Sequence, residues 1–392
     1  MMDYTYLIIG GGMTADAAVR GIRSVDASGK IGIISDDRYP PYNRPLLSKG
    51  LWVGESFDSI WRKTEEEGVI LHLETRAESI DINNKTVTDN KGNSYTFKKL
   101  LLATGGSPNR LSCSDPDVNY FRTLDDYNRL HELYLRGESF VIIGSGFIAT
   151  ELAASLAMNG KNVAMLFRSR SIGSKIYPKG FANFLNAYYT ENGVKLIPNS
   201  MPTSITKKGN QYLITTTNGT ELIADGVIAG IGIHPNTELA EKCGLNIDNG
   251  VVVDPFLQTS HPDIYAAGDV ANFYSPALDR RVRIEHEDCA NSMGFCVGKN
   301  MTGKQEKYNY LPHFYSDLFE LGYEAVGELD GSMEIVEDWH DQYRKGAIYY
   351  LKDNCLRGAI LWGIWDQLDP IKEMIASKQK LLPEQLIGKI VI

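Results

Sequence analysis

The chain has 392 residues, enough for two or three domains, and its composition of 43% hydrophobic and 23% charged residues is typical of globular proteins. Its formal net charge of −9 argues against a nucleic-acid partner, because contacts to phosphate groups require a basic surface. No run of about 18 apolar residues occurs, so no membrane span is expected. The first motif starts too close to residue 1 to leave room for a targeting segment, and a cytoplasmic location is the default expectation.

Residues 4–18, YTYLIIGGGMTADAA, predict a strand, a glycine-rich turn and a helix in succession. The apolar run Tyr6–Ile9 is typical of a buried parallel strand. Gly10, Gly12 and Ala15 fill the three positions of a G-x-G-x-x-G/A pattern, which lets the backbone and a helix N-terminus approach a pyrophosphate. Because the pattern lies between a strand and a helix, it favours a dinucleotide site over a tight turn without a ligand.

The next predicted strand, Lys30–Ser35, ends at Asp36. A carboxylate at this position accepts hydrogen bonds from the ribose hydroxyls of a dinucleotide. The alternative is an ordinary turn residue, but the preceding glycine pattern favours the ribose.

A second unit of the same kind begins in the middle of the chain. Residues 140–152, FVIIGSGFIATEL, place Gly144, Gly146 and Ala149 between a predicted strand and a predicted helix, and Val163–Phe167 is the second strand. Two dinucleotide folds in one chain indicate two nucleotides, one resident and one exchangeable.

The second strand of this unit ends without a carboxylate and is followed by Arg168 and Arg170. Guanidinium groups suit a 2′-phosphate, so the two arginines slightly favour NADP(H) over NAD(H). The alternative is that both arginines are surface charges and that NADH binds through other groups.

Residues 39–51, YPPYNRPLLSKGL, hold two cations, Arg44 and Lys49, in an otherwise apolar and extended stretch. P-Y-x-R-P-x-L-S-K after a dinucleotide fold is similar to the ferredoxin-reductase-like FAD-dependent pyridine nucleotide oxidoreductases, especially to their apoptosis-inducing factor branch. The resemblance implies that Arg44 and Lys49 contact FAD, with Lys49 near the reactive N5 edge. Composition alone would make both of them solvated cations. The long C-terminal insertion of animal apoptosis-inducing factors has no room between Ile335 and Tyr343.

Other motifs extend the resemblance along nearly the whole chain. Residues 264–271, IYAAGDVA, are similar to the family's second FAD motif, in which Asp269 bonds the ribitol chain, although a chance Gly-Asp turn is the alternative. Glu285 and His286 match an Arg-x-Glu-His motif over the flavin and nicotinamide, and the basic run before them departs slightly in register. Tyr315 stands where many relatives carry tryptophan, which predicts weaker stacking on the flavin. The remaining FAD-side contacts that the resemblance implies are Ala77 and Arg110.

On the NAD(P)H side the resemblance implies that Phe147 shields the flavin and that Glu151 pairs with Lys49. Gly232 lies in the returning strand of that site. For Phe147 the alternative is ordinary helix packing, and Glu151 alone would be an unremarkable acid near a helix N-terminus. Lys49, Glu151 and His286 are therefore the candidate catalytic residues. A histidine can serve as an acid or base, but hydride transfer does not require one, so we expect His286 to position the reactants.

The five cysteines show no closely spaced pair of the kind that forms a redox-active disulfide, which favours a reducing compartment. Cys289 and Cys296 are about two helical turns apart, and we expect buried neighbours rather than a redox couple. No metal ligand set is predicted.

The sequence thus predicts an α/β fold with two Rossmann-like domains of the glutathione-reductase type and a C-terminal α+β domain. The FAD domain would comprise residues 1–113 and 248–307, the NAD(P)H domain residues 114–247, and the C-terminal domain residues 308–392.

The resemblance implies that NAD(P)H delivers a hydride to N5 of FAD and that electrons then pass to a ferredoxin- or rubredoxin-type protein, a quinone or another small acceptor. Such protein partners are usually acidic, as is this chain, so a local basic patch would be needed. The alternative is a slow NAD(P)H-responsive redox sensor, in which a charge-transfer complex changes the contacts of the protein. A homodimer is a further expectation.

Overall fold

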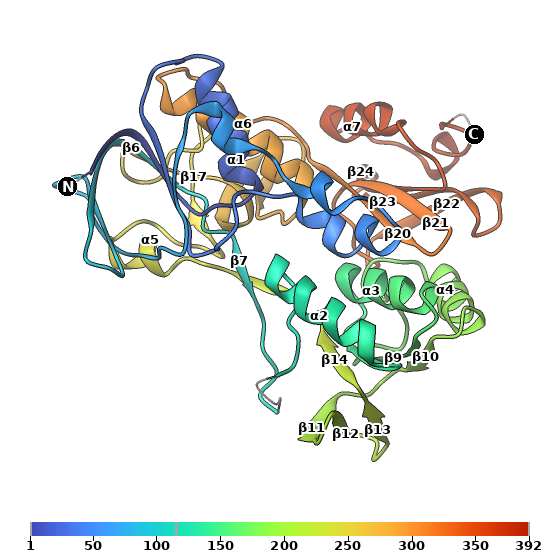
Figure 1. The fold of residues 1–392 in the computed structure, drawn as a ribbon. Helices are drawn as coiled ribbons and strands as arrows, with labels where there is room; N and C mark the ends of the chain where they lie inside the picture. The colour runs from blue at the N-terminus through green and yellow to red at the C-terminus, as the bar shows by residue number, and fades with distance from the viewer. Residues whose placement is uncertain (1, 114–116, 391–392) are drawn as a thin grey trace. The chain divides into compact units, whose positions relative to one another are not determined.

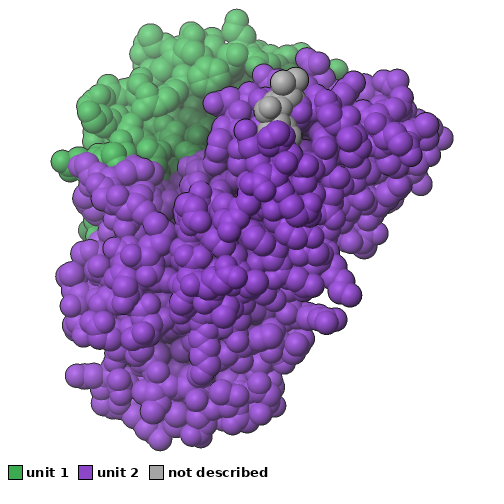
Figure 2. All heavy atoms as spheres, turned by 90° about the vertical axis from the view of Figure 1, so that its right-hand side faces the viewer, with its two compact units in different colours: residues 1–43, 58–107, 234–314 green, residues 44–57, 108–233, 315–392 purple. Residues whose placement is uncertain are grey.

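The computed structural model describes residues 2–113 and 117–390. The chain folds into two compact units, coloured separately in Figure 2. Unit 1 contains residues 1–43, 58–107 and 234–314, and unit 2 contains residues 44–57, 108–233 and 315–392. None of the helices in the described part of the chain is long and apolar enough to cross a membrane.

Unit 1 is built on a sheet with the strand order β3-β2-β1-β6-β5-β4, and β17 pairs with β6. The strands β1, β2, β3, β6 and β17 run parallel, whereas β4 and β5 are antiparallel additions at one edge. The bounds are β1 (Met2–Ile9), β2 (Ile31–Ile34), β3 (Ile70–His72), β4 (Ala77–Asp81), β5 (Thr86–Asp89), β6 (Ser94–Leu102) and β17 (Ile264–Ala266). Leu7 and Ile8 of β1 are fully buried, as the apolar run predicts for a central strand.

Smaller elements complete unit 1. They are α1 (Met13–Arg23), α5 (Glu238–Lys242), α6 (Glu287–Met301), β16 (Val251–Val252), β18 (Ala271–Ser275) and β19 (Arg280–Val282), with the 3₁₀ turns η3 (Phe57–Ile60), η4 (Thr64–Glu67) and η5 (Gly268–Val270). The chain leaves unit 1 within β7 (Gly106–Pro108) and returns within β15 (Ile233–Pro235).

Helices α1 and α6 lie side by side (Figure 1) and touch through glycines. A Cβ on Gly298 would stand 2.1 Å from the carbonyl oxygen of Ala18, and one on Gly294 would stand 2.5 Å from that of Thr14. A Cβ on Gly21 of α1 would in turn stand 2.2 Å from the carbonyl oxygen of Phe295. The two backbones therefore approach more closely than any side chain at these positions would allow.

A buried ion cluster ties α1 to its surroundings. Asp16 is fully buried, and its carboxylate accepts hydrogen bonds from Arg62 Nε at 2.8 Å, Thr64 Oγ1 at 2.7 Å and Arg20 Nε at 3.1 Å. Arg62 also donates to Asn291 of α6 at 2.8 Å, so one side chain bridges both helices. Burial by itself would raise the pKa of Asp16, but these hydrogen bonds outweigh it and hold that pKa below its ordinary value.

Unit 2 contains the second dinucleotide fold, a parallel sheet of order β10-β9-β8-β14. Its elements are α2 (Leu124–Arg136), β8 (Ser139–Ile143), α3 (Phe147–Met158), β9 (Asn162–Leu166), α4 (Lys179–Glu191), β10 (Lys195–Ile197) and β14 (Gly226–Ala229). A small antiparallel sheet of β11 (Pro202–Lys208), β12 (Gln211–Thr216) and β13 (Glu221–Ala224) is inserted before β14. Both predicted strand–glycine–helix units are therefore present, and the predicted α/β fold is confirmed.

The C-terminal part of unit 2 is an antiparallel sheet of order β20-β21-β24-β23-β22 with one helix. Its elements are β20 (His313–Leu318), β21 (Leu321–Gly327), β22 (Glu334–Asp341), β23 (Lys345–Lys352), β24 (Cys355–Trp362) and α7 (Leu368–Ser377), with the 3₁₀ turns η1 (Arg44–Leu47), η2 (Gly50–Trp52) and η6 (Pro383–Gln385) elsewhere in the unit.

The compact units do not follow the predicted domain borders. The chain changes unit at 43/44, 57/58, 107/108, 233/234 and 314/315, whereas the predicted borders are at 113/114, 247/248 and 307/308. Residues 234–247 belong to unit 1 because Ala240 and Leu245 pack into its core. Residues 114–116, at the predicted crossing, lie outside the described residues. The three-domain division stays a prediction.

Candidate functional site

The first glycine turn lies at the carboxyl end of β1. Gly10 has a φ of +111°, and a Cβ there would stand 2.1 Å from the carbonyl oxygen of Ala103, so only glycine fits. Gly12 is the N-cap of α1 and makes no side-chain cap, which leaves the first N–H groups of the helix for a ligand. Ala15 is fully buried in the first turn of that helix.

A cavity of about 730 Å³ opens at the carboxyl ends of β1 and β2. Gly10, Asp36 and Ala77 all line it, so the structure brings together three residues that the sequence assigned to FAD. A carboxylate beside a glycine turn fits the ribose and pyrophosphate of a dinucleotide. Sequence reasoning missed other lining residues, which have no motif of their own: Thr75, Ser107, Glu238 and Lys242.

A second group of predicted FAD residues gathers in unit 1 around Arg283. Its guanidinium pairs with Glu285 at 2.6 Å and donates to the backbone oxygen of Asp269 at 3.2 Å. His286 is the N-cap of α6, and its ring stacks on Phe314 with centroids 4.1 Å apart. The structure therefore joins Asp269, Glu285 and His286 next to the positive end of a long helix.

The glycine turn of unit 2 repeats the geometry of the first. Gly144 has a φ of +126°, and a Cβ there would stand 2.2 Å from the carbonyl oxygen of Gly230. Ala149 packs on Gly230, which fixes the turn against the strand that returns through Gly232. Gly146 caps α3, and a Cβ there would meet nothing within 4 Å, so this face of the turn is open to a ligand.

Arg168 and Arg170 are exposed on either side of Ser169. The hydroxyl of Ser169 lies 3.2 Å from that of Ser145, which belongs to the glycine turn. The two arginines therefore border the glycine turn of unit 2 rather than a remote part of the surface.

Lys49 and Glu151 form an ion pair in unit 2, with Nζ 3.3 Å from Oε1. Nζ also donates to the backbone oxygen of Tyr315 at 3.0 Å and lies 3.6 Å above the centre of its ring. Glu151 is buried, and burial raises its pKa, while the ammonium of Lys49 and nearby hydroxyls oppose that rise. Ser48 and Ser316, which donate to Glu151 at 2.7 Å each, were missed by sequence reasoning.

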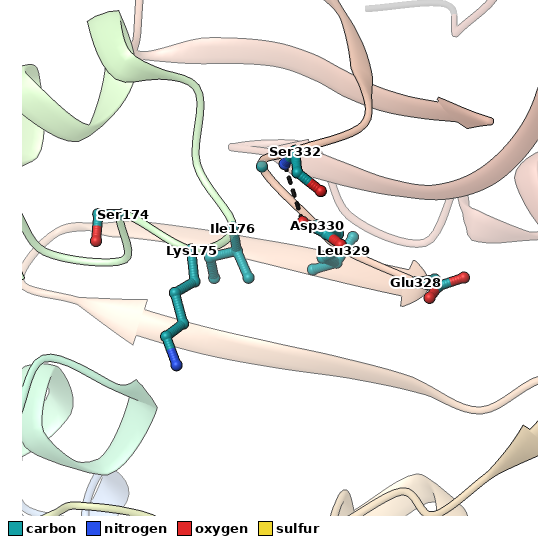
Figure 3. A pocket seen from close by; sticks show the side chains of 8 residues that line it. Ser174, Lys175, Ile176, Glu328, Leu329, Asp330 and Ser332 are labelled. Atoms are coloured by element: carbon teal, nitrogen blue, oxygen red, sulfur yellow. Dashed lines mark hydrogen bonds between the residues drawn. The ribbon is translucent and has the colours of Figure 1, made fainter.

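The other predicted residues of unit 2 lie on separate elements. Arg110 lies 4.7 Å from the centre of the Tyr120 ring, Arg44 begins η1, and Phe147 is the first residue of α3. Their contacts to FAD stay predictions, as do the roles of all the site residues above. A separate cavity of about 680 Å³ lies in unit 2. Lys175, Asp330 and Ser332 are among its lining residues, and none of the lining residues is a predicted site residue (Figure 3).

All five cysteines are free thiols. Cys289 and Cys296 are buried in α6, as predicted, and burial raises the pKa of Cys296 to about 11 and that of Cys289 further. Both thiols are protonated at neutral pH, which does not suit a redox couple. No group of metal-ligating side chains occurs in residues 2–113 and 117–390.

Known proteins resemble the chain along most of its length. Residues 4–294 match the pyridine nucleotide-disulphide oxidoreductase family. A putative mitochondrial apoptosis-inducing factor 1 of Drosophila melanogaster is 30% identical over 96% of this chain, which spans only 63% of that relative. Monodehydroascorbate reductase 3 of Arabidopsis thaliana is 32% identical over 92% of this chain and 90% of its own length.

The solved structure of a covalent putidaredoxin reductase–putidaredoxin complex matches with a TM-score of 0.92 at 26% identity, over 99% of this chain and 97% of the other. Similarity of this extent agrees with the two glycine turns, the cavity beside Asp36 and the motifs described above. The chain belongs to the pyridine nucleotide-disulphide oxidoreductase family and is an FAD-dependent oxidoreductase that uses a pyridine nucleotide.

Proposed function

We propose that this protein oxidises NADPH in preference to NADH and passes the electrons to a small electron-transfer protein or another small acceptor. The observation that carries the electron-transfer part of the proposal is the Lys49–Glu151 pair, an ammonium held by a buried carboxylate beside an aromatic ring. Bound FAD would supply the redox chemistry, as a hydride acceptor that can pass electrons on. The protein supplies position and electrostatics.

Lys49 is proposed to serve the flavin, as the family resemblance implies. A fixed cation favours the negative charge that a cofactor gains on reduction, and it acts more strongly away from bulk water. Glu151 holds that cation by charge and geometry. His286 is proposed to position the reactants, because its ring is fixed by Phe314 and by its place at the N-cap of α6.

The preference for NADPH rests on Arg168 and Arg170. Both are exposed and border the glycine turn of unit 2 through the contact between Ser169 and Ser145. A 2′-phosphate would meet two guanidinium groups there and no carboxylate from residues 167–176.

Replacing both arginines by alanine should raise KM for NADPH by about 10- to 100-fold, because a hydrogen bond to a charged group contributes about 1.5–3 kcal/mol. KM for NADH should change less than threefold by the same reasoning, since NADH lacks the phosphate. Steady-state kinetics with both nucleotides measure the two effects. Arg129→Ala, on the exposed face of α2, is the control. Equal losses for both nucleotides, or a native enzyme that prefers NADH, would contradict the proposal.

The proposed acceptors come from two similar proteins, a putidaredoxin reductase and a monodehydroascorbate reductase. One is in complex with putidaredoxin, and the other is named for monodehydroascorbate. Arg280 and Arg281 are exposed on β19 and give unit 1 the local positive charge that an acidic protein partner would need, although the chain is acidic as a whole.

A panel of acceptors tests this proposal. Purified protein with bound FAD is given NADPH or NADH and a ferredoxin-type protein, a quinone, monodehydroascorbate or oxygen. We expect turnover on the order of 1–1,000 per second with one acceptor, the ordinary range for enzymes. Turnover that falls as salt is added would identify a charged protein partner.

A redox sensor is the second candidate, favoured by the similarity to the Drosophila protein. A sensor would have its flavin reduced slowly by NAD(P)H, so turnover would be slow with every acceptor. Its oligomer size would change when the nucleotide binds. Light scattering with and without NADPH distinguishes it from the enzyme. A homodimer is also proposed, and the same measurement tests it.

A further inference from the structure

The carboxylate of Glu151 is held by more than Lys49. Glu151 is 4% exposed, and its Oε1 atom accepts from Ser316 Oγ at 2.7 Å in addition to Lys49 Nζ at 3.3 Å. Its Oε2 atom accepts from Ser48 Oγ at 2.7 Å. Ser48 and Ser316 are themselves buried, so bulk water cannot replace either hydroxyl.

Ser316 also bonds Tyr323 of β21, which extends the network. The hydroxyl of Tyr177 donates to that of Tyr323 at 3.0 Å. Ser316 donates its proton to the carboxylate of Glu151, which can only accept. Ser316 thus links the two tyrosines to Glu151.

In the described part of the chain, the titratable groups that face Glu151 from the elements around it are Lys49, Tyr177, Tyr189 and Tyr323. Burial raises the pKa of each tyrosine above its ordinary value, so all three remain neutral in the working pH range. The charge that balances Glu151 therefore comes from Lys49, and the hydroxyls add orientation without charge.

We propose that Ser316 is a positioning residue for hydride transfer, which keeps Glu151 ionised and thereby keeps Lys49 charged and in place. The proposal rests on the role proposed above for Lys49. Burial favours the protonated carboxyl, and each hydrogen bond to the carboxylate favours the ionised one. Removing one of two hydroxyl donors shifts that balance, and a protonated Glu151 no longer offers Lys49 a counter-charge.

The test is the pH dependence of flavin reduction by NADPH in stopped flow, on protein with FAD bound. In Ser316→Ala the acid limb of the profile should move to higher pH by about one unit, since a hydrogen bond to a charged group is worth about one pKa unit or more. Ser316→Cys keeps the side chain's size but donates weakly, and should shift the limb the same way. Tyr323→Phe should give a smaller shift. Ser275→Ala removes another buried serine, in unit 1, and should leave the profile unchanged.

An unmoved acid limb in both Ser316 variants would overturn the inference. If only one of the two Ser316 variants retains flavin, the acid limb of that variant alone decides whether the inference holds. Lys49→Met separates this failure from failure of the proposed function. A Lys49→Met protein that reduces its flavin at the native rate refutes the role of Lys49 itself. A slow Lys49→Met protein with an unmoved limb in the Ser316 variants refutes Ser316 alone. In a protein that carries Lys49→Met, adding Ser316→Ala should not move the acid limb any further. A further movement would show that Ser316 acts through a group other than Lys49.

Discussion

Gly10→Ala should lower the free energy of unfolding by about 2–5 kcal/mol and reduce the amount of flavin that purifies with the protein. A left-handed backbone costs a residue with a side chain about 1–2 kcal/mol, and overpacking adds about 1–3 kcal/mol. The new methyl group would stand 2.1 Å from the carbonyl oxygen of Ala103, so the turn or β6 must move. Urea unfolding and the visible absorbance of the flavin measure the two effects.

Gly92→Ala is the matched control for this prediction. Gly92 also has a positive φ, +80°, but a Cβ there would meet nothing within 4 Å. It should therefore show only the backbone part of the loss, about 1–2 kcal/mol, with full flavin content. Equal losses in the two variants would mean that the close approach to Ala103 is unimportant.

Asp16→Ala should lower the free energy of unfolding by about 3–5 kcal/mol, as expected when one member of a buried ion pair is removed. Arg62 would lose the carboxylate at 2.8 Å while its side chain remains only 14% exposed. Asp81→Ala is the control, because Asp81 is exposed and its carboxylate accepts hydrogen bonds from Asn83 and Asn84 in its own turn. It should cost less than about 1 kcal/mol, and a similar loss in both variants would contradict the prediction.

The same carboxyl makes a pH dependence whose sign follows from its pKa. Hydrogen bonds hold the pKa of Asp16 below its ordinary value in the folded protein. Its contribution is therefore fully present above about pH 4, the pKa of an unfolded aspartate, and is lost as the pH falls below that. The difference in stability between the native protein and Asp16→Ala should shrink over this range. A difference that stays constant down to pH 3, roughly one unit below the ordinary pKa, would contradict this account.

Local signals in the sequence were enough for the two nucleotide folds. Gly10 and Gly144 are recognisable because a strand precedes each and a helix follows, and Asp36 is recognisable because it ends the next strand. The pairing of Lys49 with Glu151 was expected only from resemblance, because nothing in a single sequence links residues so far apart.

Other parts of the site could not be predicted for the same physical reason. Ser316 lies 165 residues from Glu151, and a single serine carries no periodicity or spacing that identifies its partner. Asp16 lies in a helical pattern, and only the fold brings Arg62 to it from 46 residues away. The segment 234–247 follows the second fold in sequence but packs through Leu245 into the core of the first, which a composition-based border cannot reveal.

The glycine crossing of α1 and α6 has a consequence for how unit 1 tolerates change. The backbones of α1 and α6 are in direct contact at Gly21, Gly294 and Gly298. Neither helix can therefore shift or tilt without moving the other. The starting ends of both helices, one at Gly12 and one at His286, are thereby locked into one rigid frame. Both helix N-termini carry a partial positive charge, so a methyl group between the helices would also change the distance between these two helix ends.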